Sequence, residues 1–319
     1  MSDNHTNFSL YGKSPLYQLF VSMLIILGIG IFLFSLSLLA GNHIFDSNLG
    51  VLENPSTATS QKDIMFLRYV MISQDIALFV IPALIILTLI KPGGRVHLAD
   101  LKLPHINDLA LVVVLAFCIF PMTSFAGQLN SGMNLPDWLS GVQEWMEEKE
   151  DNANNMIEIL IVSNSFRVMI LNLFMIAVLP AIGEELIFRG VLQKIGYRLF
   201  KSGHLAVWIV AFLFSALHFQ FFGFIPRFIL GLVFGYLYLW SGTLWLSVIA
   251  HFVNNAVPVI GVYIKGWEKM NSIPDISLWK QLMGLTLPLI ISLLILQYFS
   301  NNYKKKRERE MNHTQITYS

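Results

Sequence analysis

The sequence has few charged residues and almost no cysteine. Asp, Glu, Lys and Arg make up 13% of the 319 residues, about half the roughly 25% of a soluble domain. A single cysteine, Cys118, excludes an intrachain disulfide and a cysteine metal cluster. The net charge of +1 provides no basic field for nucleic acid. With 55% hydrophobic residues and a mean hydropathy of +0.61, the composition indicates a polytopic membrane protein.

Apolar runs that are long enough to cross a bilayer recur along the chain. A membrane-spanning helix needs about 20 mainly apolar residues. The sequence predicts an all-α, polytopic membrane protein with about eight transmembrane helices. The expected spans are Leu16–Ala40, Ile64–Ile90, Leu109–Gly127, Phe166–Ile182, Leu205–His218, Ile225–Trp240, Thr243–Val262 and Leu282–Phe299. The first run is too long for a signal-peptide core, so we interpret it as a retained span.

Lys and Arg near the ends of the spans predict that both termini are cytoplasmic. In that orientation twelve basic residues lie inside and eight outside, and the outer side takes most of the acids. The inside residues are Lys13, Lys91, Arg95, Lys102, Lys194, Arg198, Lys201, Lys304, Lys305, Lys306, Arg307 and Arg309. The basic tail Lys304–Arg309 is expected to anchor the last helix at an anionic inner leaflet. We therefore predict a multi-pass protein of the cell (inner or plasma) membrane.

The long acidic connection Gln128–Ser165 lies on the predicted outer side and contains a short amphipathic stretch. Trp138, Val142 and Trp145 recur at helical spacing, with Asp137 as the expected N-cap. We interpret this stretch as an interfacial helix with a tryptophan belt. A lid over a substrate entrance is the alternative, because long loops are often functional.

Three of the predicted spans contain polar side chains where these are costly. Each ionisable group costs about 2.5–3.5 kcal/mol to insert, so each needs a partner or a function. These side chains are Glu184, Glu185 and Arg189 in the fourth span, His218 at the end of the fifth, and His251 and Asn255 in the seventh. At a rise of 1.5 Å per residue, Glu184, His218 and His251 lie about 15, 20 and 12 Å from the inner surface. The groups can therefore share one layer.

Helical geometry assigns different roles to these side chains. Glu185 and Arg189 are i,i+4 neighbours and can pair, whereas Glu184 is rotated by about 100° and faces elsewhere. A buried carboxylate suits a general base, and with a histidine it can deprotonate a water molecule. His251 and Asn255 are also i,i+4 neighbours and can donate hydrogen bonds to an oxyanion. The expected chemistry is amide hydrolysis without a covalent intermediate.

Structural interpretations of the same residues stay open. The Glu185–Arg189 pair, Asn255 and the histidines can serve stability, helix–helix hydrogen bonding or proton relay instead of catalysis. Asp75 and Arg227 are interpreted as interfacial or pairing groups. Residues expected to pack helices rather than contact substrate are Phe214, Gly231 and Gly235.

The polar residues resemble the CAAX protease and bacteriocin-processing family of intramembrane glutamic proteases. The pattern of that family is two glutamates followed after three residues by arginine, then Phe-x3-His, then His-x3-Asn. This chain reads Glu184-Glu185-Leu-Ile-Phe-Arg189, Phe214-Ser-Ala-Leu-His218 and His251-Phe-Val-Asn-Asn255, in the same order and over about residues 175–260. Any one of the motifs is weak, but the three together on membrane helices are specific.

The resemblance implies an all-α membrane fold with an intramembrane catalytic cavity open toward the cytosol. By carry-over, Glu184 activates water with help from His218, and His251 and Asn255 form the oxyanion site. Glu185 and Arg189 then support the geometry. The implied enzyme uses no cofactor and no metal. Its expected partners are a membrane-associated protein or peptide substrate and the lipid bilayer, without nucleic acid.

The predicted organisation has three parts. Residues 1–165 form an N-terminal three-span region with the outer acidic connection, residues 166–265 the catalytic core, and residues 266–319 the last span and basic tail. One alternative is a zinc protease using His218, His251 and Glu184, although no His-Glu-x-x-His motif is present. Others are a proton-coupled transporter that uses the same buried groups, and a non-catalytic scaffold.

Overall fold

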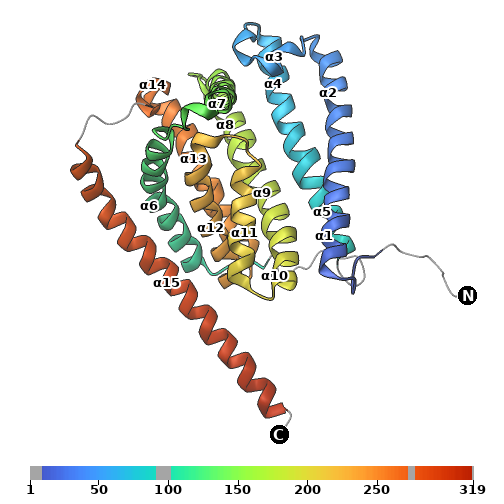
Figure 1. The fold of residues 1–319 in the computed structure, drawn as a ribbon, viewed down its shortest axis with the longest axis vertical. Coiled ribbons are helices and arrows are strands. Elements are labelled where there is room, and N and C mark those ends of the chain that lie inside the picture. Colours follow the sequence, from blue (N-terminus) through green and yellow to red (C-terminus); the bar gives the residue numbers. More distant parts are fainter. Residues whose placement is uncertain (1–8, 91–101, 272–276, 318–319) are drawn as a thin grey trace, which may run out of the picture. The chain divides into compact units, whose positions relative to one another are not determined.

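The computed structural model describes residues 9–90, 102–271 and 277–317, with side chains as far as residue 305. Every regular element within these ranges is a helix (Figure 1), which confirms the predicted all-α class. Lys91 and Arg95 lie outside the described residues, as do the side chains of the basic tail beyond Lys305. The orientation predicted from these charges stays a prediction.

The chain divides into two compact units, which we describe separately. Unit 1 comprises Met1–Leu101 and Asn152–Ala206, and unit 2 comprises Lys102–Asp151 and Val207–Ser319. Two of the three boundaries fall within α7 (Ser140–Ile161) and α11 (Gly203–Ala216). The predicted division into three functional parts, at residues 165 and 265, does not coincide with these compact units and stays a prediction.

Unit 1 contains helices that are interrupted by π-helical turns. In chain order its elements are α1 (Pro15–Leu24), η1 (Ile25–Gly30), α2 (Ile31–Phe45), α3 (Gly50–Glu53), η2 (Pro55–Thr57), α4 (Gln61–Gln74), η3 (Asp75–Val80), α5 (Ile81–Leu89), the end of α7, α8 (Phe166–Asn172), η6 (Leu173–Val178), α9 (Leu179–Glu185), η7 (Leu186–Gln193) and α10 (Lys194–Phe200). The π-helical turns are η1, η3, η6 and η7. Such turns are rare and frequently occur at functional sites.

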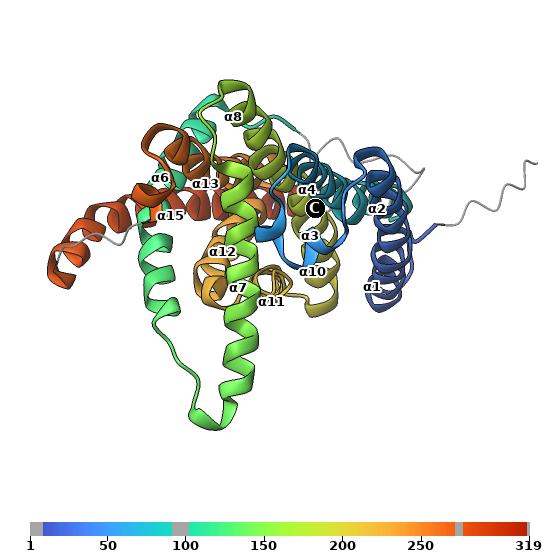
Figure 2. The ribbon, with the colours of Figure 1, turned by 90° about the horizontal axis from the view of Figure 1, so that it is seen from above.

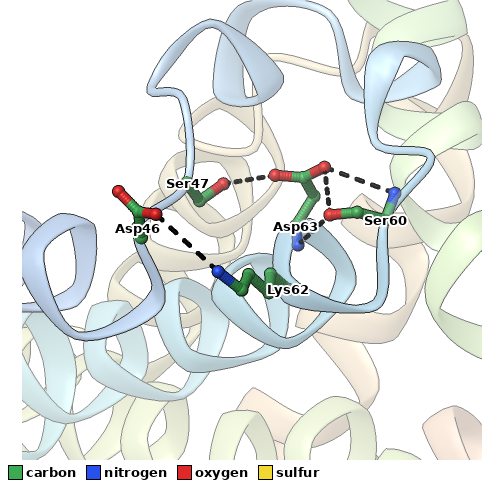
Figure 3. A network of polar contacts seen from close by, with 5 residues as sticks. All are labelled: Asp46, Ser47, Ser60, Lys62 and Asp63. Atoms are coloured by element: carbon green, nitrogen blue, oxygen red, sulfur yellow. Dashed lines mark hydrogen bonds and ion pairs between the residues drawn. The ribbon is translucent and has the colours of Figure 1, made fainter.

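A polar network defines the start of α4. Ser60 accepts a hydrogen bond from the backbone of Asp63, whose carboxylate accepts one from the Ser60 backbone, forming a capping box. Ser47 donates a 2.6 Å hydrogen bond to the same carboxylate, and Lys62 lies 3.7 Å from Asp46 (Figure 3). The network connects the end of α2 to the start of α4, and these helices lie side by side (Figures 1 and 2).

The carbonyl at the end of α7 receives two buried hydrogen bonds in unit 1. Arg68 on α4 donates from Nη2 to the Leu160 carbonyl at 3.2 Å, and Asn172 on α8 donates to the same oxygen at 2.9 Å. The last carbonyls of a helix have no intrahelical partner, so these bonds satisfy one of them. Arg68 therefore has a structural role inside an apolar helix.

Unit 2 packs α6 (Ile106–Ser131), α12 (Phe224–Ser241), α13 (Leu244–Lys265) and α15 (Leu278–Thr317) around an apolar core. Its shorter elements are η5 (Asp137–Leu139), η8 (Phe221–Gly223) and α14 (Trp267–Asn271). Buried core residues include Leu115, Phe234, Leu246 and Phe299. A Cβ atom on Gly231 would lie 3.0 Å from Ala211, so α11 and α12 approach closely at this glycine. The expected packing role of Gly231 is thereby confirmed.

Seven described helices are long and apolar enough to cross a membrane, where about eight were predicted. The difference is the expected span Leu205–His218, which is the 14-residue helix α11. At 1.5 Å per residue this helix is about 21 Å long, short of the roughly 30 Å hydrocarbon core. The multi-pass membrane class is confirmed.

The connection Gln128–Ser165 is more helical than predicted. Asp137 lies inside the 3₁₀ turn η5 and is preceded by Pro136, so the expected Asp137 N-cap is wrong. The following α7 has 22 residues, and its amphipathic beginning belongs to unit 2. Trp138 is 80% exposed, whereas the ring of Trp145 packs 5.2 Å from that of Phe221. The two tryptophans therefore have different environments.

Candidate functional site

Unit 1 holds the two adjacent glutamates and the arginine. Glu184 and Glu185 end α9, and Arg189 lies in the π-helical turn η7. Arg189 donates a 2.8 Å hydrogen bond to Glu185, and both side chains are fully buried. The i,i+4 pair predicted from the sequence is present. Glu184 is 8% exposed and interacts electrostatically with Arg189.

The helix that carries Glu184 packs closely on η3. A Cβ atom on Gly183 would lie 3.0 Å from Cβ of Phe79 and 3.2 Å from Cγ2 of Val80. A Cβ atom at these distances would require Phe79 and Val80 to shift by a few tenths of an ångström. Asp75, at the start of η3, is also buried, and its carboxylate interacts electrostatically with Glu184. Asp75 lies fourteen residues after Gln61 in the apolar Gln61–Leu89 helix, and its expected role as an interfacial or pairing group stays a prediction.

In unit 2, His218 does not lie in a helix, contrary to the expectation. The helix α11 ends at Ala216, and Phe219 has a left-handed φ of 52°. Nδ1 of His218 lies 2.6 Å from the Phe214 carbonyl. A bulky residue with positive φ is uncommon and often marks a functional segment. The turn directs the chain away from the helix axis immediately after the imidazole.

Phe214 contacts both histidines of the motifs. Its ring centroid lies 5.1 Å from that of His218 and 5.9 Å from that of His251, in edge geometry each time. The ring of His251 also stacks on the ring of Phe234, with a centroid distance of 5.0 Å and an interplanar angle of 20°. His251 is buried on α13, and Phe234 is buried on α12. Unit 2 therefore brings the two imidazoles around one phenyl ring, which is the packing role expected for Phe214.

Asn255 lies one helical turn after His251 on α13 and is half-buried. Asn254 donates a 3.3 Å hydrogen bond to its side-chain oxygen. The side-chain N–H₂ of Asn255 is a hydrogen-bond donor. Such a donor is what the resemblance requires of this residue.

The segment that follows His218 is held by two other helices of unit 2. Asn130 on α6 donates to the Phe221 carbonyl at 2.9 Å and accepts from the backbone of Ile225 at 3.0 Å. Trp145 on α7 packs on the ring of Phe221. Sequence reasoning missed Asn130 because a polar residue near a span end has no distinguishing local pattern.

Arg227 on α12 pairs within the same region. It donates hydrogen bonds to the backbone and side chain of Gln220, and its charge acts on Glu150 of α7. Burial raises the pKa of Glu150, and the Arg227 charge opposes that change. The pairing role expected for Arg227 is confirmed.

Comparison with known proteins covers the region of these motifs. Residues 166–257 match the family described as Rce1-like type II CAAX prenyl endopeptidase. This match, whose residues 166–257 we call the CAAX protease segment, agrees with the resemblance of the three motifs to the CAAX protease and bacteriocin-processing family. The CAAX protease segment includes Glu184, Glu185, Arg189, His218, His251 and Asn255. It excludes Asp75 and α6.

One similar protein is the uncharacterized protein YpbD of Bacillus subtilis (strain 168), 33% identical over 90 residues. The aligned stretch covers 27% of this chain and 43% of YpbD, so this chain spans under half the length of its relative. No solved structure matches the chain. The CAAX protease segment begins in unit 1 with the glutamates and ends in unit 2 with the histidines.

Proposed function

We propose that this chain is a metal-independent glutamic endopeptidase that hydrolyses a peptide bond of a membrane-associated protein or peptide. The observation that carries the proposal is the buried Glu184 beside the Glu185–Arg189 pair, inside a CAAX protease segment of an apolar helix. A carboxylate that costs about 2.5–3.5 kcal/mol to insert needs a function. Arg189 has a 2.8 Å hydrogen bond to Glu185, and Glu184 is rotated by about 100° from that pair on the helix, so we propose Glu184 as the base.

In the proposed mechanism Glu184 takes a proton from a water molecule as the water oxygen attacks the scissile carbonyl carbon. His218 orients the same water. His251 and Asn255 donate hydrogen bonds to the carbonyl oxygen as it becomes an oxyanion. When the C–N bond breaks, the proton passes from Glu184 to the leaving nitrogen. Water is consumed, and a carboxylic acid and an amine are released.

The substrate class follows from the location of the site. Residues at membrane depth are reached by segments that lie in or beside the bilayer, so we propose a lipidated tail or a membrane-bound peptide. The match to a CAAX prenyl endopeptidase family favours the lipidated tail. We also propose the cell membrane as the location, with both termini cytoplasmic, which reporter fusions at each end can test.

The decisive experiment compares cells that carry the wild-type chain with cells that carry Glu184→Gln. Terminal-peptide mapping of the membrane fraction should find new termini in the wild type that the variant lacks. The variant should retain the melting temperature of the wild type in detergent, which separates lost chemistry from lost folding. Equal sets of termini would refute Glu184 as the base.

Chelation separates the glutamic mechanism from a zinc protease. Activity on the mapped substrate should survive a strong chelator, because no metal takes part in the proposed steps. Loss of activity that zinc restores would instead assign Glu184, His218 and His251 to a metal. Proton-coupled flux into liposomes without peptide cleavage would favour the transporter.

A further inference from the structure

The loop of residues 217–223, here called the His218 loop, connects α11 to α12 and includes η8. The helix α11 ends at Ala216, and α12 begins at Phe224. Phe219, directly after His218, has a left-handed φ of 52°. A bulky residue with this backbone conformation costs free energy and persists only where the surrounding contacts fix the chain. The contacts that hold the His218 loop therefore matter for the position of the imidazole.

Asn130 on α6 holds the second half of the His218 loop. Its side chain is 7% exposed, and Nδ2 donates to the Phe221 carbonyl at 2.9 Å while Oδ1 accepts from the Ile225 backbone at 3.0 Å. The N–H of Ile225 is one of the first in α12, and these have no intrahelical acceptor. The N-cap residue Gly223 has no side chain that could accept this bond. Asn130 supplies the missing cap from another helix and ties the loop to α6 with the same carboxamide.

Ser215 holds the first half of the His218 loop. Its buried hydroxyl donates a 2.6 Å hydrogen bond to the carbonyl of Phe224, which joins the end of α11 to the start of α12. The backbone N–H of His218 donates to the Ser215 carbonyl at 3.3 Å. Asn130, Ser215 and the loop all belong to unit 2, so these contacts lie within one compact unit. The loop is fixed at both ends, and Asn130 provides its attachment to α6.

The position of the His218 loop determines which nitrogen of the imidazole carries the proton. Nδ1 of His218 lies 2.6 Å from the Phe214 carbonyl oxygen. A carbonyl oxygen only accepts, so Nδ1 is the donor, and Nε2 of the neutral ring is the acceptor. This tautomer fits the role proposed for His218, because Nε2 can accept a hydrogen bond from the water that Glu184 deprotonates.

We propose that Asn130 is a positioning residue for His218. Its carboxamide fixes the carbonyl of Phe221 and the N–H of Ile225 at one point of α6, and the fixed loop keeps the imidazole on the Phe214 carbonyl. Asn130 acts through the backbone of the loop and lies outside the CAAX protease segment. The proposal rests on the function proposed above, in which His218 orients the attacking water.

Asn130→Asp separates the two hydrogen bonds of the carboxamide. A carboxylate still accepts from the Ile225 N–H at the start of a helix, where negative charge is favourable, but it cannot donate to the Phe221 carbonyl. Asn130→Asp should therefore retain the cap of α12 and lose the bond to the loop, whereas Asn130→Ala loses both. Ser131→Ala is the matched control, because it removes the hydrogen bond of an exposed neighbour to the Gln128 carbonyl and leaves the bonds of Asn130 in place. All measurements are made below the melting temperature of each variant, so that only folded protein contributes.

Nitrogen NMR of the full chain, labelled with ¹⁵N-histidine in lipid nanodiscs at pH 8, tests the positioning without any substrate. The signals of His218 are identified by their loss in His218→Gln. The wild type should show a protonated Nδ1 and an unprotonated Nε2. Asn130→Asp and Asn130→Ala should shift both signals toward a mixture of tautomers, because the loop no longer holds the ring on the Phe214 carbonyl, and Ser131→Ala should keep the wild-type shifts. Wild-type shifts in Asn130→Asp, or a protonated Nε2 in the neutral ring of the wild type, would overturn the proposal.

Kinetics separate a failed positioning role from a failed peptidase. With a quenched peptide ending in a farnesylated CAAX sequence, Asn130→Asp should lower kcat by up to about 100-fold with KM unchanged, as expected when a catalytic group is misplaced. Ser131→Ala should retain the wild-type kcat. A wild-type kcat in Asn130→Asp would refute the positioning role. If the wild type cleaves no peptide, the proposed peptidase fails, while the NMR result still decides whether Asn130 positions His218.

Discussion

Arg189 and Glu185 form a 2.8 Å ion pair in which both side chains are fully buried. A buried pair is strongly coupled, because removal of one partner leaves the other charged and without compensation. The contribution of this pair to stability therefore has to be measured with variants that change both residues.

Arg189→Ala should destabilise the chain by about 3–5 kcal/mol, since Glu185 would remain as an uncompensated buried charge. The double variant Glu185→Leu with Arg189→Met should recover most of the lost melting temperature in detergent. Both proteins are compared by thermal unfolding monitored through tryptophan fluorescence. A double variant as unstable as Arg189→Ala would show that lost packing, and not the uncompensated charge of Glu185, causes the destabilisation.

Gly183→Ala tests the close approach of α9 to η3. The added Cβ would lie 3.0 Å from Cβ of Phe79, so the Phe79 side chain or one of the helices has to shift, and overpacking of this kind costs about 1–3 kcal/mol. Gly28→Ala is the matched control, because a Cβ there meets nothing within 4 Å. Gly28→Ala should leave the melting temperature unchanged or raise it slightly. Equal effects of the two substitutions would contradict the close contact.

Phe214→Leu tests whether the phenyl ring orients the two histidines. Leucine keeps most of the buried volume, so stability should fall by less than about 1.5 kcal/mol. The edge contacts to His218 and His251 are lost, and kcat should fall by up to about 100-fold. Phe212→Leu, an exposed position on the same helix, should retain full activity. The measurement is initial rate at saturating substrate, and unchanged kcat in Phe214→Leu would refute the orienting role.

Glu150 predicts a pH dependence of the contact between α7 and the segment after His218. Burial raises the pKa of Glu150 above its ordinary value of 4.5, so the folded state favours the protonated form. This contribution to stability is complete below the unfolded-state pKa and is lost as pH rises through the folded-state pKa. Hydrogen exchange of residues 219–225 should therefore accelerate with pH beyond the intrinsic rate in the wild type. Glu150→Gln should abolish that excess, and an equal excess in both proteins would contradict the role of Glu150.

Several features follow from local sequence patterns. Hydropathy over 20-residue windows predicts the membrane class, because the bilayer selects apolar helices whatever their neighbours are. The spacing of Glu185 and Arg189 predicts their pair, because residues four apart meet on any helix. The three motifs likewise lie in the matched segment 166–257.

Other features depend on tertiary structure. Composition does not distinguish the short helix α11 from a full membrane span. The helix α11 ends before His218, and the segment that follows is contacted by Asn130 and Trp145 from other helices. The contact of Phe214 with His251 joins residues 37 positions apart.

The interaction of Asp75 with Glu184 is the clearest example of a contact that depends on tertiary structure. These residues are separated by more than one hundred positions, and each taken alone is only a polar residue in an apolar run. They interact because Gly183 allows α9 to approach η3. The sequence by itself determined the medium in which the chain folds and the pairs within single helices. Contacts between helices were decided by side-chain packing, which no local pattern encodes.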